Sequence, residues 1–212
     1  MDIAWTMKII PAAIIGLTVH ECAHAWTAYL CGDSTAKDEG RLTLNPLKHI
    51  DPLGFLLIVV AGFGWAKPVH FNPDNLKHKH RDEILISLAG PVSNFLLALL
   101  FLVIARIMYS LPFFRTGELG IEAVRILLLW GVINFGLFIF NLIPIPPLDG
   151  SHVYMTFLKS VSEHFLRNAY KFGTLGLLII IIIQNRMDIE IIPLSPMIRG
   201  ITKFFMTLLS FN

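Results

Sequence analysis

The chain has 212 residues, of which 55% are hydrophobic and only 15% are charged, and its mean hydropathy is +0.67. Soluble domains carry about 25% charged residues, so the composition excludes an ordinary soluble globule and predicts a multi-pass protein of the lipid bilayer. The net charge of +2 is too small to indicate a nucleic-acid-binding protein. We expect one integral-membrane domain over residues 1–212, with its core at about 3–155 and a C-terminal part at about 160–212.

The first predicted helix covers residues 3–30 and contains the pattern HExxH. Its residues are His20, Glu21 and His24, with Cys22 and Ala23 between them. Because positions i and i+4 share one face of a helix, both histidines can reach the same metal ion. Glu21 stands over that face and can take a proton from a metal-bound water. An alternative is a pair of helix histidines that make polar contacts only.

Zinc is the metal that this pattern favours. Imidazole and carboxylate ligands with one open position are the usual set of a catalytic zinc site. Histidines and a glutamate inside an apolar segment are also costly to keep, which favours a functional role for them. We therefore expect one zinc ion per chain.

Shorter elements are predicted between this helix and the next long apolar run. Residues 32–34 end the first helix, and the alternating residues 41–44 predict a short strand closed by an Asn-Pro pair. The apolar segment 53–65 is only about 13 residues long, whereas a helical crossing needs about 20. We therefore expect a re-entrant segment there, then an extended stretch over 66–73 and a basic, histidine-rich surface loop over 77–81.

Three more long apolar runs predict further membrane crossings. The predicted elements are crossings over 84–109, 122–142 and 172–184, a short helix over 151–159, and an interfacial amphipathic helix over 196–209. Three prolines between the third crossing and the short helix forbid a regular helix there. The fold class is thus an all-α membrane bundle of about four to six transmembrane or re-entrant helices, with short strand segments between the first and second full crossings.

Asp149 is the candidate third metal ligand. It follows the third crossing, so it can meet His20 and His24 only if that crossing and the first helix end on the same side of the membrane. This condition holds if residues 53–65 do not cross. The metal site therefore depends on the re-entrant interpretation that the short length of this segment already favours.

The distribution of positive charge gives an independent orientation. Ten of the 17 Lys and Arg residues fall in segments on the HExxH side. Cytoplasmic loops carry an excess of such residues. We therefore expect a multi-pass plasma-membrane protein with its HExxH side toward the cytosol and its N-terminus outside.

Four sequence runs together resemble the site-2 protease family of intramembrane zinc metalloproteases. They are HECAH at 20–24, GWAKPV at 64–69, AGPVSN at 89–94 and NLIPIPPLDG at 141–150. The chain is similar to the compact prokaryotic members that lack PDZ and CBS domains. The resemblance implies zinc held by His20, His24 and Asp149, with Glu21 as the general base.

The resemblance also implies substrates that are transmembrane proteins, cut during regulated intramembrane proteolysis or the clearance of membrane remnants. Asn141 and Asn94 are candidates for substrate binding. Asn141 can hydrogen-bond the substrate or the oxyanion, or satisfy loose backbone where a helix ends, and Asn94 has a similar pair of interpretations. Two alternatives for the whole chain stay open: an inactive pseudoprotease that binds membrane segments, and a zinc-handling membrane transporter.

Overall fold

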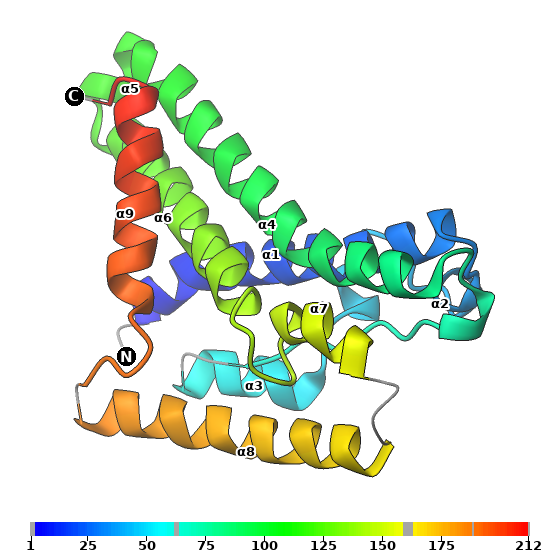
Figure 1. Cartoon of the computed structure of the whole chain (residues 1–212). Helices are drawn as coiled ribbons and strands as arrows, with labels where there is room; N and C mark the ends of the chain where they lie inside the picture. Colours follow the sequence, from blue (N-terminus) through cyan, green and yellow to red (C-terminus); the bar gives the residue numbers. More distant parts are fainter. Residues whose placement is uncertain (1–2, 62–63, 159–162, 188, 212) are drawn as a thin grey trace.

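The computed structural model describes residues 3–61, 64–158, 163–187 and 189–211, and these residues are mostly helical (Figure 1). The elements in chain order are α1 (Ile3–Leu30), α2 (Thr35–Asp38), the 3-10 turn η1 (Pro46–Lys48), α3 (Pro52–Ala61), the 3-10 turn η2 (Pro73–Asn75), α4 (Lys79–Ser110), α5 (Pro112–Thr116), α6 (Glu118–Asn141), α7 (Asp149–Leu158), α8 (Glu163–Met187) and α9 (Leu194–Leu208). Four of them, α1, α4, α6 and α8, are long and apolar enough to cross a membrane. The prediction of a helical membrane bundle is confirmed.

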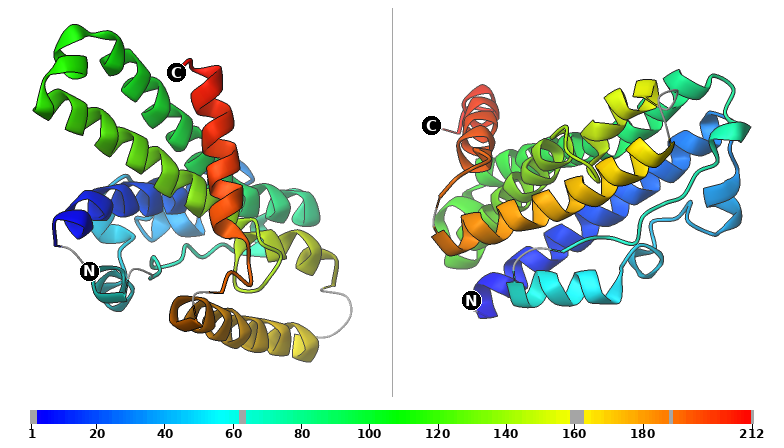
Figure 2. Two further views of the ribbon diagram at one scale, coloured as in Figure 1. Left: turned by 90° about the vertical axis from the view of Figure 1, so that its left-hand side faces the viewer. Right: turned by 60° about the horizontal axis from the view of Figure 1, so that its bottom comes forward.

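Helices α1, α4 and α6 form the centre of the bundle. Helix α4 packs against both α1 and α6, and α5 links α4 to α6 in a helical hairpin (Figures 1 and 2). Small residues allow close crossing, because a Cβ at Gly131 of α6 would lie 3.3 Å from the Ala98 carbonyl oxygen of α4. Buried Leu102 and Phe135 complete this contact. The three helices are therefore packed together as the core of the bundle.

Helix α1 ends where its sequence predicts. Gly32 has φ +111°, a conformation that glycine adopts without steric cost. This turn lets the Asp33 N–H donate to the Ala28 carbonyl at 3.0 Å, which satisfies one of the last free carbonyls of the helix. The Asp33 carboxylate then accepts hydrogen bonds from the Asn72 N–H and the Asn75 side chain. The C-terminal end of α1 is thereby joined to the segment that leads into α4.

The two C-terminal helices differ in how they pack. The apolar side chains of α9 pack on α4 and α6, where Ile201 and Phe205 join the cluster of Ala98, Leu102 and Phe135. The apolar face of the predicted amphipathic helix therefore packs on other helices of the protein. Helix α8 lies at the periphery (Figure 2), and its candidate span is only 6% buried, against 28–44% for the other three.

Two predictions about the first connecting region are wrong, the short strand segments and the surface loop over 77–81. Among the described residues there is no strand, and an isolated bridge between Ile50 and Ala66 takes the place of the expected short strand segments. Residues 41–44 form a bend instead, because the Thr43 N–H donates to the Arg41 carbonyl and no second strand lies beside them. The Arg41 guanidinium is buried and donates to the backbone carbonyls of Lys48, Lys67 and Pro68.

The predicted surface loop over 77–81 is also partly helical. Helix α4 begins at Lys79 rather than at Ile84. The Asp82 carboxylate accepts a hydrogen bond from the His78 N–H at 2.8 Å, which satisfies a free donor at the helix start. The short helices α2 and α5 were not predicted.

Candidate metal centre

The two HExxH histidines face one point on the side of α1. Their Nε2 atoms are 3.0 Å apart, and the two rings meet nearly edge to face at an interplanar angle of 84°. Both side chains are buried. The spacing of four residues in a regular helix accounts for this convergence.

Asp149 meets these histidines from the first turn of α7. Its Oδ2 lies 3.1 Å from the His20 Nε2 and 3.4 Å from the His24 Nε2. Gly150 makes this position possible, since a Cβ there would lie 2.5 Å from the Leu142 carbonyl carbon and 2.9 Å from the Ile143 oxygen. The start of α7 can thus fold back closely on the end of α6. The predicted approach of Asp149 to the two histidines is therefore present in the structure.

The donor atoms fit a zinc ion. Zinc–nitrogen bonds of about 2.0–2.1 Å in a tetrahedral site place neighbouring ligand atoms about 3.3 Å apart, close to the three separations of 3.0, 3.1 and 3.4 Å. The Asp149 Oδ2 is buried and has no hydrogen-bond partner, as expected of an atom that needs a cation. Within the described residues, no other group of three or more His, Cys, Asp or Glu side chains lies close enough to hold a metal.

The outward ring nitrogens have partners that favour metal binding. The His24 Nδ1 lies 2.7 Å from the Ile86 carbonyl oxygen, and the His20 Nδ1 lies 2.7 Å from the Asn94 Oδ1. Because both partners are acceptors, each neutral ring carries its proton on Nδ1 and leaves the Nε2 lone pair free. Three lone pairs then converge on one buried point, an arrangement that a bound cation stabilises.

Gly90 of α4 leaves the space in front of these nitrogens open. A Cβ at this position would lie 2.6 Å from the His20 Nε2 and closer still to the His24 Nε2. Any larger residue would occupy the volume that a metal and its open coordination position need. The AGPVSN run therefore contributes an empty volume at Gly90 and a hydrogen bond at Asn94.

Glu21 is buried and points toward the extended stretch 66–71. Its Oε2 accepts a hydrogen bond from the Val69 N–H at 2.9 Å. That stretch is fixed by the Arg41 guanidinium and by a hydrogen bond from the Lys67 N–H to the His49 carbonyl at 2.8 Å. Sequence analysis missed the role of Arg41 because its contacts depend on the path of two loops.

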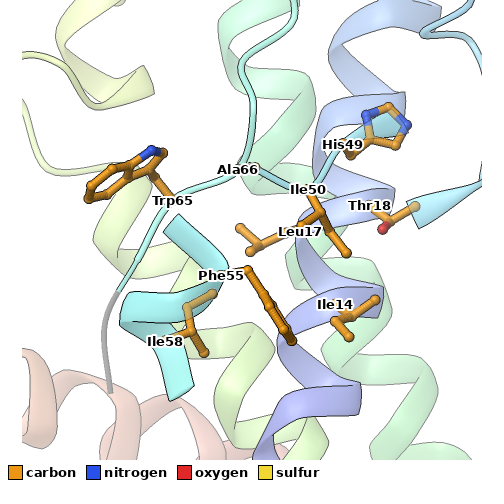
Figure 3. A pocket seen from close by; sticks show the side chains of 9 residues that line it. All are labelled: Ile14, Leu17, Thr18, His49, Ile50, Phe55, Ile58, Trp65 and Ala66. Carbon is orange, nitrogen blue, oxygen red and sulfur yellow. The ribbon is translucent and has the colours of Figure 1, made fainter. Parts of the chain in front are cut away.

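The Ile50–Ala66 bridge lies against α1 just before the HExxH residues. Figure 3 shows the small cavity between them, lined mostly by apolar side chains of α1, α3 and the bridge. Phe55 of α3 points toward Ile14 and Leu17 of α1 in this view. Apolar packing therefore places the stretch that contacts Glu21.

The two candidate substrate-binding asparagines lie in different surroundings. Asn94 is fully buried, and its amide group contacts His20, Gly16 and Asn134, so it lies behind the histidine rather than at an open surface. Asn141 is partly buried at the end of α6, and its Nδ2 donates to the Leu137 carbonyl. Asn141 is thus the more accessible of the two.

Comparisons with known proteins find a matching family and similar chains. The profile of peptidase family M50 matches residues 115–183. A protein of Bacillus subtilis (strain 168) named "Putative zinc metalloprotease YwhC" is 40% identical over 171 residues, which cover 80% of this chain and 77% of that protein. A protein of Mycolicibacterium smegmatis named "Putative zinc metalloprotease Rip2" is 30% identical over 191 residues, covering 87% and 71%. No solved structure matches the chain.

Proposed function

The chain belongs to peptidase family M50, the site-2 protease family, and we propose that it hydrolyses peptide bonds in or near the transmembrane segments of other membrane proteins. The observation that carries the proposal is the convergence of His20, His24 and Asp149 beside buried Glu21, in a chain with four candidate membrane spans. The proposal includes one zinc ion per chain, held by the two histidines and Asp149, and the convergence of their ligand atoms supports it.

In the proposed reaction, bound zinc supplies Lewis-acid activation of a water molecule and of the scissile carbonyl. Glu21 accepts a proton from the attacking water and passes it to the leaving amine, so that a C–O bond forms as the peptide C–N bond breaks. The Val69 N–H holds the Glu21 carboxylate in one orientation before the substrate arrives. Asn141, the more accessible asparagine, donates a hydrogen bond to the substrate backbone.

A substrate helix must unwind locally, because its carbonyls are otherwise bonded within the helix. The stretch 66–71 is a suitable surface for an unwound segment. Lys67 and Val69 direct their N–H groups toward His49 and Glu21, and alternate residues of an extended chain face opposite edges. On the outer edge, the Pro68 carbonyl already accepts from Arg41, and the backbone groups of Ala66 and His70 on either side are the ones proposed to pair with the substrate by strand addition.

The proposed setting is a bilayer, with the site near the cytosolic side of the plasma membrane. The charge distribution supports this orientation, since ten of the 17 Lys and Arg residues lie in segments on the HExxH side. Water can then reach a site close to one membrane surface more readily than a site at mid-membrane.

The test compares the wild-type chain with Glu21→Gln, both purified in detergent and incubated with a single-pass membrane reporter. Glutamine cannot accept the proton, so cleavage should fall by at least about 100-fold, while His20, His24 and Asp149 keep the zinc. Cleavage by both proteins at equal rates would contradict the assigned base. Zinc in both proteins without cleavage of several helix-destabilised reporters would favour a pseudoprotease or a zinc-handling transporter.

A further inference from the structure

A chain of buried amide groups runs from the metal-site histidine into the centre of the bundle. The Asn94 side chain of α4 lies between His20 of α1 and Asn134 of α6, and both asparagines are fully buried. The three helices meet at this point, beside the backbone of Gly16. Asn134 belongs to none of the sequence runs that indicated the site.

In this series of buried amide groups, the donor and acceptor atoms of each partner determine the direction of every hydrogen bond. The Asn134 Nδ2 donates to the Trp130 carbonyl at 2.9 Å, so the Asn134 Oδ1 faces Asn94 as an acceptor. The Asn94 Nδ2 donates both to that oxygen, at 3.1 Å, and to the Gly16 carbonyl, at 3.0 Å. The Asn94 Oδ1 must then face the His20 Nδ1, which has to be the donor across their 2.7 Å separation.

This directionality selects one tautomer of His20. A neutral imidazole that carries its proton on Nδ1 leaves Nε2 free to bind a metal. An Asn94 amide turned by 180° would present its NH2 group to Nδ1, and His20 would have to protonate Nε2 instead. Only the orientation with the NH2 group toward Asn134 and Gly16 is compatible with metal binding.

We propose that Asn134 is a positioning residue, which acts through Asn94 to hold His20 in its metal-binding tautomer. The inference rests on the proposed function, because it concerns the affinity of that same site. Asn134 contacts neither the metal ligand atoms nor the substrate surface. Its effect passes through the Asn94 amide group. The Asn94 NH2 group finds two acceptors, the Gly16 carbonyl and the Asn134 Oδ1, in only one orientation of the amide.

The absence of a side chain at Gly16 leaves space for the Asn134 side chain to reach Asn94. A Cβ at Gly16 would lie 2.7 Å from the Asn134 Oδ1 and 2.7 Å from the Leu137 Cδ1, both well inside ordinary contact distance. Gly16→Ala should therefore displace Asn134 and weaken metal binding, although it changes no polar side chain.

The experiment measures zinc affinity of the full-length chain in detergent, by competition with a chelator. Asn134→Leu should bind zinc about 10- to 100-fold more weakly, the usual effect of losing a group that orients a ligand. Asn134→Asp should stay within about threefold at pH 6, since a buried neutral carboxyl keeps an acceptor for Asn94 and a donor for Trp130. Phe135→Leu, at the fully buried neighbouring position, is the matched control and should retain wild-type affinity.

Two further measurements separate positioning from a general loss of stability. In an Asn94→Ala background, Asn134→Leu should have no additional effect on zinc affinity, because its route to His20 is already broken. The absorption spectrum of the cobalt-substituted protein should change in Asn134→Leu and stay unchanged in Phe135→Leu. Gly16→Ala should give the same altered spectrum as Asn134→Leu.

The outcomes distinguish this inference from the proposed function. Absence of zinc from the wild-type chain overturns the metal site itself. If the wild type binds zinc, then equal affinity in Asn134→Leu, an equal loss in Phe135→Leu, or additive effects of the two asparagine substitutions overturns the positioning role alone.

Discussion

Replacing Gly90 by alanine tests the geometry of the metal site most directly. The added methyl group would lie 2.6 Å from the His20 Nε2 and even closer to the His24 Nε2, whereas ordinary contacts begin at 3.4 Å. Both rings are buried and anchored through Nδ1, so neither can move without losing a hydrogen bond. At least one histidine must therefore leave its place beside Asp149.

Gly90→Ala should affect the stability of the metal-free protein and its zinc affinity to different extents. Alanine inside a helix is favoured over glycine by about 1 kcal/mol, which offsets part of the cost of displacing a buried histidine, so the metal-free protein should lose less stability than the site loses zinc affinity. Displacement of a ligand should weaken zinc binding by at least about 100-fold, equivalent to about 2.7 kcal/mol. Gly90→Ala should thus separate metal affinity from folding.

The assay is chelator competition on the detergent-purified chain, with thermal unfolding measured on the metal-free protein. The matched control is Gly176→Ala in α8, another helical glycine in a candidate span, where an added Cβ meets nothing within 4 Å. The control should bind zinc normally. Wild-type zinc affinity in Gly90→Ala would refute the placement of the three ligands around the space in front of Gly90.

Two other predictions concern buried charged residues that hold the connecting segments in place. Arg41→Lys should lower cleavage by about 10-fold or more with unchanged zinc content, because a single ammonium cannot replace a guanidinium that holds the 66–71 stretch against Glu21. Unchanged cleavage would exclude this support. Burial raises the pKa of the Asp33 carboxyl, but hydrogen bonds from Thr35, Asn75 and Asn72 outweigh it and hold the pKa below the ordinary 3.8. The stabilisation is therefore present above about pH 4 and lost as pH falls through the folded-state pKa, so thermal unfolding should show a drop in acid that Asp33→Asn reduces. The same drop in the variant would contradict this assignment.

Much of the fold could be predicted because it depends on local patterns. Runs of apolar residues long enough to span a bilayer predicted α1, α4, α6 and α8, since backbone groups in lipid must bond within a helix. The boundaries were less certain, and α4 began earlier than expected because Asp82 satisfies its first turn. The strand predicted over 41–44 failed because a strand requires a partner that the local sequence does not specify.

The approach of Asp149 to the histidines could also be predicted, by an argument from topology. A segment too short for a crossing, as α3 is, was expected to leave the ends of α1 and α6 on one side of the membrane, and Asp149 does lie beside the two histidines. The substrate-binding interpretation of Asn94 did not anticipate its buried position behind His20, because that position depends on where α4 crosses α1.

The sequence by itself determined which residues are able to bind a metal and which segments are long and apolar enough to cross a membrane, since both depend on residue type and spacing along one helix. Only the tertiary structure decided the surroundings of those residues. Asn134 is 114 residues from His20 along the chain, and Arg41 reaches carbonyls up to 27 residues away. Such contacts depend on how closely helices cross, which the small residues Gly16 and Gly90 permit, and on loop paths that no local pattern encodes.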